Sequence, residues 1–65
     1  MNIRVNGIEC EVKAADLDSL LAELDYAGQT VATALNRTFV RKKDRAQVRV
    51  SEGDEVEILT PRQGG

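Results

Sequence analysis

The first 24 residues of the chain change abruptly from one hydrophobic period to another. Polar and apolar side chains alternate over residues 2–13 on either side of Asn6-Gly7, a pattern typical of an antiparallel hairpin with a type I′ turn. From Leu17 to Leu24, leucines then recur at i, i+3, i+4 and i+7, which predicts an amphipathic helix. Because so short a helix is unstable alone, we expect its leucines to pack on the apolar face of the hairpin.

Polar residues and a glycine mark the expected ends of this helix. Asp16 suits the N-cap, because its carboxylate can accept a hydrogen bond from the first turn, and Ser19 is an alternative start. Gly28 is expected to stop the helix, since glycine readily adopts the left-handed conformation of a C-cap. One face of the hairpin carries Ile8, Cys10 and Val12 and is expected to point inward. The Cys10 thiol should therefore be buried and inert.

The rest of the chain predicts two or three further strands. Residues 31–36 favour a strand, although their alanines leave a helix open, and residues 39–41 favour a short strand after a turn. Residues 42–47 are polar and charged and are expected to form a loop, whereas Val48 and Val50 suit a short strand or turn. Residues 55–60 alternate cleanly, which predicts a last strand.

This order of elements indicates a two-layer α+β fold. At 65 residues the chain is one domain, which we place at residues 1–60. So regular a last strand should be paired on both sides, and the natural place for it is beside the first strand, in parallel. The prediction is the β-grasp (ubiquitin-like) arrangement, a mixed four- to five-stranded sheet with one main helix packed on one face.

Composition excludes several classes of function. With one cysteine and no histidine, the chain has no disulfide framework, no ordinary metal site and no histidine-based catalytic dyad. Six of nine basic residues lie within residues 37–49, but the net charge of −2 argues against nucleic acid. This basic cluster is expected to be a solvated loop or a docking site for an acidic partner. Apolar runs are too short for a membrane span and the N-terminus is unlike a signal peptide, so a cytoplasmic protein is expected.

The sequence ends in a segment that cannot pack, Pro61-Arg62-Gln63-Gly64-Gly65. No apolar side chain follows the last strand, so residues 61–65 are expected to form a flexible tail. A frayed end is the simplest interpretation. The functional one is that glycines without a Cβ can thread a narrow channel and deliver the α-carboxylate of Gly65.

Taken together, these segments resemble the ThiS family, the ubiquitin-like sulfur carriers of thiamine biosynthesis. The resemblance covers essentially the whole chain and rests on Val5-Asn6-Gly7, the leucine-rich helix, Val31-Ala32 with Ala34-Leu35-Asn36, Gly53-Asp54-Glu55-Val56-Glu57-Ile58-Leu59, and Gln63-Gly64-Gly65. One loop departs from the family pattern, because Arg41 follows Val40 where a proline is usual and Arg45 stands where a tryptophan is expected.

The resemblance implies that the chain is a substrate of other enzymes and not an enzyme itself. A ThiF-like adenylating enzyme would use ATP to activate the Gly65 carboxylate. A cysteine desulfurase or a persulfide protein would supply sulfur to make a thiocarboxylate. A ThiG-like thiazole synthase would receive that sulfur. No cofactor, nucleic acid or membrane is implied.

Two groups of residues are the candidate sites under this interpretation. The tail would enter the partner's channel through Arg62, Gln63, Gly64 and Gly65, with Gly65 as the modified residue. Partner docking is assigned to Leu59, Arg41 and Arg45. Two other functions remain open, a molybdopterin-synthase-type sulfur carrier and a non-covalent ubiquitin-like docking module.

Overall fold

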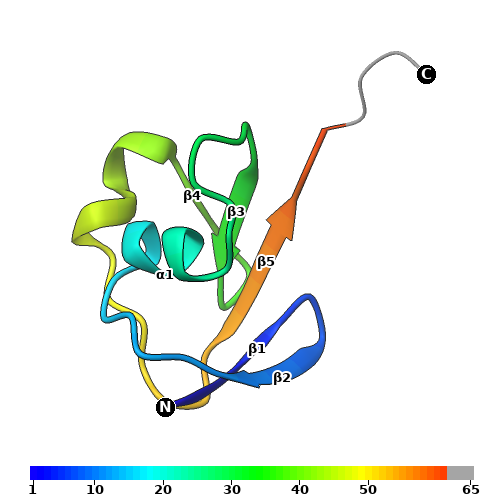
Figure 1. Ribbon diagram of the computed structural model, residues 1–65, viewed down its shortest axis with the longest axis vertical. Helices are drawn as coiled ribbons and strands as arrows, with labels where there is room; N and C mark the ends of the chain where they lie inside the picture. The colour runs from blue at the N-terminus through cyan, green and yellow to red at the C-terminus, as the bar shows by residue number, and fades with distance from the viewer. Residues whose placement is uncertain (62–65) are drawn as a thin grey trace.

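A computed structural model of the protein describes residues 1–61 and contains one mixed five-stranded sheet (Figure 1). The strands lie in the order β2-β1-β5-β3-β4, with β5 in the middle. β5 runs parallel to β1, as the sequence predicted, and antiparallel to β3 on its other side. In chain order the elements are β1 (Asn2–Val5), β2 (Ile8–Glu11), α1 (Leu17–Glu23), β3 (Ala32–Leu35), β4 (Thr38–Val40), the 3-10 helix η1 (Lys42–Gln47) and β5 (Glu55–Leu59). This is the β-grasp fold.

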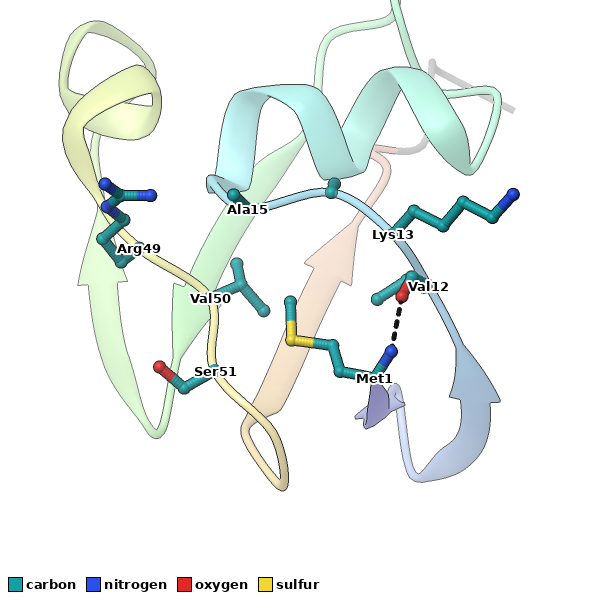
Figure 2. Close-up of a pocket in the computed structure, with 8 residues that line it drawn as sticks. Met1, Val12, Lys13, Ala15, Arg49, Val50 and Ser51 are labelled. Carbon is teal, nitrogen blue, oxygen red and sulfur yellow. Dashed lines mark hydrogen bonds between the residues drawn. The ribbon is translucent and has the colours of Figure 1, made fainter.

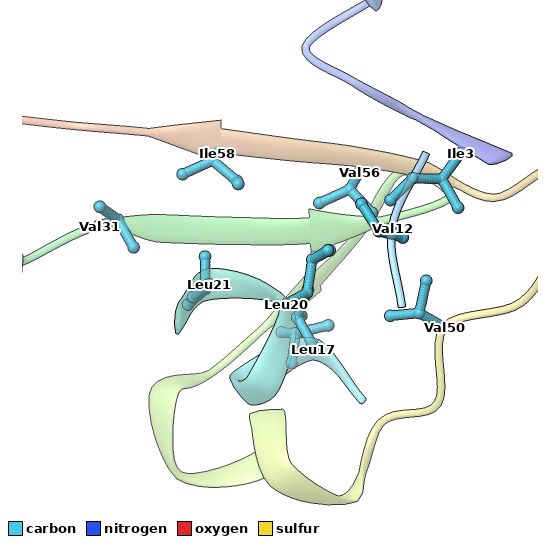
Figure 3. Close-up of a cluster of buried hydrophobic side chains, with 10 residues drawn as sticks. Ile3, Val12, Leu17, Leu20, Leu21, Val31, Val50, Val56 and Ile58 are labelled. Atoms are coloured by element: carbon cyan, nitrogen blue, oxygen red, sulfur yellow. The ribbon is translucent and has the colours of Figure 1, made fainter. Parts of the chain in front are cut away.

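A single hydrophobic core lies between the sheet and α1 (Figure 3). The alternation of β5 directs Val56 and Ile58 into it, and both are almost fully buried. The leucines of α1 cover them from the other side and share the core with Ile3 and Val12 of the hairpin, on which they were predicted to pack (Figure 3). The buried set is Ile3, Val12, Leu17, Leu20, Leu21, Val31, Val40, Val50, Val56 and Ile58.

The ends of α1 are set by two aspartates. Asp16 is the N-cap, as predicted, and its carboxylate accepts hydrogen bonds from the Ser19 backbone N–H at 2.9 Å and the Ser19 hydroxyl at 2.8 Å. These two bonds, the backbone bond first, hold the pKa of Asp16 below its ordinary value.

The prediction that Gly28 stops the helix is wrong, because α1 ends at Glu23 with Leu24 as its C-cap. Asp25 follows in the left-handed conformation, with φ of 69°. The N–H of Tyr26 donates to the carbonyl of Leu21, and the N–H of Asp25 donates to that of Ala22. This pair of bonds is a Schellman motif, and an aspartate fills the position where glycine is usual.

The side chains on the predicted inward face of the hairpin are less buried the closer they lie to the β1–β2 turn. Val12 is fully buried and Cys10 is half-buried against the core, but Ile8 is 71% exposed. Ile8 pairs with Val5 beside the β1–β2 turn, which lies away from α1 (Figure 1). The prediction of a buried face is therefore wrong at Ile8, because the short helix does not reach that end of the hairpin.

The prediction of a loop at residues 42–47 is wrong in its conformation, although most of these residues are exposed to solvent. These residues form η1, whose Arg45 is only 6% exposed. The Arg45 Nε donates to the Thr33 hydroxyl at 3.0 Å, and its Nη2 donates to the Val31 carbonyl at 2.7 Å. The Thr33 hydroxyl in turn donates to the carbonyl of Val40 at 2.9 Å. An arginine inside η1 therefore ties this turn to β3.

The chain returns from η1 to the start of α1 through residues 48–50. The Leu17 N–H donates to the Val48 carbonyl, and the Val50 N–H donates to the Ala15 carbonyl, both at 2.9 Å. Asp16 and Arg49 form an isolated antiparallel bridge there, in place of a further strand. Neither α1 nor η1 has the length and apolar composition that a membrane span requires.

The buried arginine leads to a stability prediction. Arg45→Ala should lower the free energy of unfolding by about 2 kcal/mol, because it leaves the buried Val31 carbonyl without its donor. Arg41→Ala is the matched control, since Arg41 is exposed and its contact with Asp44 is a surface ion pair at 3.5 Å. That control should change stability by less than about 0.5 kcal/mol in urea unfolding. Equal losses for the two variants would contradict a structural role for Arg45.

Candidate functional site

The face of the sheet opposite α1 carries an apolar patch, which we call the open-face patch. It consists of Leu59 from β5, Phe39 from β4, and Ala32 and Ala34 from β3. Leu59 is 67% exposed and Phe39 is 65% exposed, so they are two of the three large apolar side chains that stand in solvent within residues 1–61.

Strand register brings these residues together. Ala32 pairs with Leu59, and Ala34 pairs with Phe39 on one side and with Glu57 on the other. Paired residues project on the same face of a sheet, so the four apolar side chains form one surface with Glu57 at its border. Between them lies a shallow recess of about 110 Å³.

A second hollow continues the patch toward the end of the chain. It has a volume of about 480 Å³ and is lined by Thr30, Val31, Ala32, Leu59, Thr60 and Pro61. Leu59 lines both hollows. A protein bound on the open-face patch would therefore also contact the segment from which the last four residues of the sequence continue.

The three predicted docking residues differ in their exposure to solvent. Leu59 is exposed, as docking requires, and Arg41 is exposed beside Asp44. Arg45 is buried and its guanidinium bonds within the fold, so the assignment of Arg45 to a docking surface is wrong. The predicted tail residues, Arg62, Gln63, Gly64 and Gly65, lie outside the described part of the chain.

Sequence reasoning missed Phe39. The signal was available, because the predicted turn at residues 36–38 pairs the strands on either side and directs Phe39 away from Val40. What the sequence did not reveal was which strand would lie beside β5, and without that neighbour Phe39 and Leu59 could not be joined into one surface.

Another hollow lies beside the N-terminus of the chain (Figure 2). It is an open cleft of about 710 Å³ beside Met1, whose α-ammonium donates to the Val12 carbonyl at 2.8 Å. Lys13 and Arg49 stand at its rim and the rest of its lining is mainly small or apolar. The only cysteine, Cys10, is not among its lining residues.

Comparisons with known proteins agree with this geometry. A model described as the ThiS family matches residues 3–65. The crystal structure of a thiamine biosynthesis protein (ThiS) from Geobacter metallireducens is 32% identical, with a TM-score of 0.84 and full coverage of both chains. The solution NMR structure of a thiamine biosynthesis protein from the same organism gives a TM-score of 0.81 at 32% identity, over 100% of this chain and 88% of that one. No curated protein sequence matches significantly.

Proposed function

The chain belongs to the ThiS family, and we propose that it carries sulfur for thiamine biosynthesis on its own terminal carboxylate. The observation that supports this most directly is the position of the open-face patch. Leu59 lies two residues before Pro61, so a partner held on the patch is also held beside the start of the tail. The carboxylate of Gly65 is the group that the tail presents.

The chemistry requires activation by another protein. A terminal carboxylate has a reference pKa of about 3.5, so it is ionised at neutral pH and is a poor electrophile. Attack of the carboxylate on the α-phosphate of ATP forms an acyl-adenylate and releases pyrophosphate. The terminal sulfur of a persulfide then displaces AMP and forms a C–S bond, and attack of a thiol on the other sulfur breaks the persulfide's S–S bond, which leaves a thiocarboxylate and a disulfide. A ThiF-like enzyme would perform the first step, a cysteine desulfurase or persulfide protein would supply the sulfur, and a ThiG-like thiazole synthase would accept it.

The chain's own contribution is recognition and delivery. Apolar anchors such as Phe39 and Leu59, in a patch bordered by an acid, suit a partner surface that is apolar with a basic rim. Glycines at positions 64 and 65 allow a close approach of the backbone to the nucleotide, because no Cβ stands in the way. Docking on the open-face patch would hold the Gly65 carboxylate close to the nucleotide of the partner enzyme. The two groups would then react at a rate set by their fixed positions and not by how often they meet in solution.

Two other functions would use the same surface. A carrier for molybdopterin synthesis would undergo the same activation but deliver its sulfur to a different enzyme. A non-covalent docking module would use the open-face patch without any reaction at Gly65. The neighbouring structures from thiamine biosynthesis favour the first assignment over both.

Intact mass spectrometry tests the covalent reaction. The protein should exchange one oxygen atom for sulfur after incubation with the ThiF-like enzyme of its own organism, ATP and a sulfur donor. Deletion of Gly65 should abolish the exchange, and Gly64→Val should block it while the unfolding transition stays unchanged. An unchanged mass for the native chain, with an enzyme that is active on another carrier, would support the docking module instead. Transfer of the sulfur to molybdopterin synthesis and not to a thiazole would support the second alternative.

The open-face patch makes a separate prediction. Leu59→Ser or Phe39→Ser should raise the KM for adenylation at least about tenfold, because each removes an apolar anchor. Ile8→Ser is the matched control, since Ile8 is just as exposed but lies outside the patch. All three variants should change the free energy of unfolding by less than about 0.5 kcal/mol. Equal KM values for the Ile8 and Leu59 variants would rule out the patch as the docking surface.

A further inference from the structure

The end of β5 extends past the end of its parallel neighbour. β1 stops at Val5, which pairs with Val56, whereas β5 continues to Leu59. Successive residues of a strand direct their N–H and C=O groups to opposite sides. The Asp54 carbonyl accepts from the Arg4 N–H on the β1 side, so the backbone groups of Ile58, four residues on, face that same side, on which β1 has already ended.

The side chain of Asn6 takes the place of the missing strand residue. Its Nδ2 donates to the Ile58 carbonyl at 3.1 Å, and its Oδ1 accepts from the Ile58 N–H at 2.8 Å. The backbone N–H of Asn6 also donates to the Val56 carbonyl at 2.9 Å. Asn6 can do this because it is already in the β1–β2 turn, with φ of 52°. A carboxamide thus completes the β1 side of β5 across 52 positions of sequence.

We propose that Asn6 is a positioning residue for the reaction of the terminal carboxylate, an inference that rests on the proposed function. Ile58 is the last residue of β5 with a neighbour on each side, since Thr33 of β3 lies opposite it and Asn6 bonds its backbone from the other side. Beyond it, within residues 1–61, only the pairing of Leu59 with Ala32 holds the chain. Asn6 thereby fixes the direction in which the chain leaves the sheet and the place of Leu59 beside the tail.

Removing the carboxamide should cost the docking step more than the chemical step. Without it, Ile58 would exchange its two hydrogen bonds for water, and the end of β5 would be paired on one side only. The segment from Ile58 to Pro61 would then have to be ordered when the partner binds, and that ordering weakens binding. Once the tail is in the partner's channel, the reacting groups are the same as before. We therefore expect a higher KM with little change in kcat.

Asn36 provides a matched control at the other end of the same strand. It also lies in a hairpin turn with positive φ, at 49°, and it also bonds β5. Its backbone N–H donates to the Glu55 carbonyl at 2.7 Å, and its Oδ1 accepts from the Glu55 N–H at 2.9 Å. The two asparagines therefore make similar bonds to β5, one at its start and one beside the tail.

The test compares Asn6→Gly with Asn36→Gly, because glycine tolerates the positive φ at both positions and removes only the side chain. Adenylation by the ThiF-like enzyme is followed as pyrophosphate release over a range of carrier concentrations. Asn6→Gly should raise KM about tenfold and leave kcat within about twofold. Asn36→Gly should leave both within about twofold. Amide hydrogen exchange should become faster at Ile58 in the first variant and at Glu55 in the second. This would verify that each substitution has removed the side-chain hydrogen bond to β5.

Asn6→Asp adds an intermediate step, because aspartate keeps the acceptor for the Ile58 N–H but loses the donor to the Ile58 carbonyl. Its KM should lie between those of the native chain and Asn6→Gly. Equal KM values for the two glycine variants would overturn the inference, since the loss would then follow general destabilisation and not the tail. Failure of the native chain to be adenylated would instead overturn the proposed function, and this inference with it.

Discussion

The pairing of β5 on both of its sides is the constraint on which the rest of the structure depends. β5 lies between the first strand of the chain and β3, parallel to one and antiparallel to the other. Its Val56 and Ile58 lie at the centre of the core, and both are nearly inaccessible to solvent. Because the last strand is also the central strand, the end of the chain leaves from the middle of the sheet. Thr60 and Pro61, which follow β5, line a hollow together with residues 30–32.

The two-residue period of β5 gives its two faces different tasks. Inward residues complete the core, while Glu57 and Leu59 project from the open face. The same alternation in β3 and β4 adds small alanines and Phe39 to that face, so Leu59 becomes part of a patch and not an isolated apolar side chain. The stability of the domain and its proposed docking surface thus come from one strand. Substitutions on the outer face can change docking while the core remains intact.

A short helix leaves part of the core to other elements. α1 has seven residues, and η1 together with residues 48–50 covers the region that it does not reach. In η1, at the position where the ThiS pattern leads one to expect a tryptophan, Arg45 bonds to Thr33 and Val31. Burying a guanidinium is costly, but no buried side-chain nitrogen or oxygen within residues 1–61 lacks a partner. This polar contact joins η1 to β3 where an aromatic side chain would do so by packing.

The sequence by itself determined most of the local elements and their order, though not η1 or the end of α1. The alternation around Asn6-Gly7, the cap at Asp16 and the regular pattern of the last strand were sufficient, because each depends on neighbours within a few positions. The exposure of Leu59 also followed from this alternation. The Schellman motif at Asp25 is local, but the sequence pattern misplaced it, because an aspartate takes the left-handed position where glycine is usual.

Apart from the parallel pairing of β5 with β1, only the tertiary structure decided the contacts between distant residues. It buried Arg45, placed Phe39 beside Leu59 and joined Asn6 to Ile58, and it left Ile8 in solvent. The reason is physical: burial and hydrogen-bond partners depend on which strands become neighbours, and a linear pattern does not contain that information.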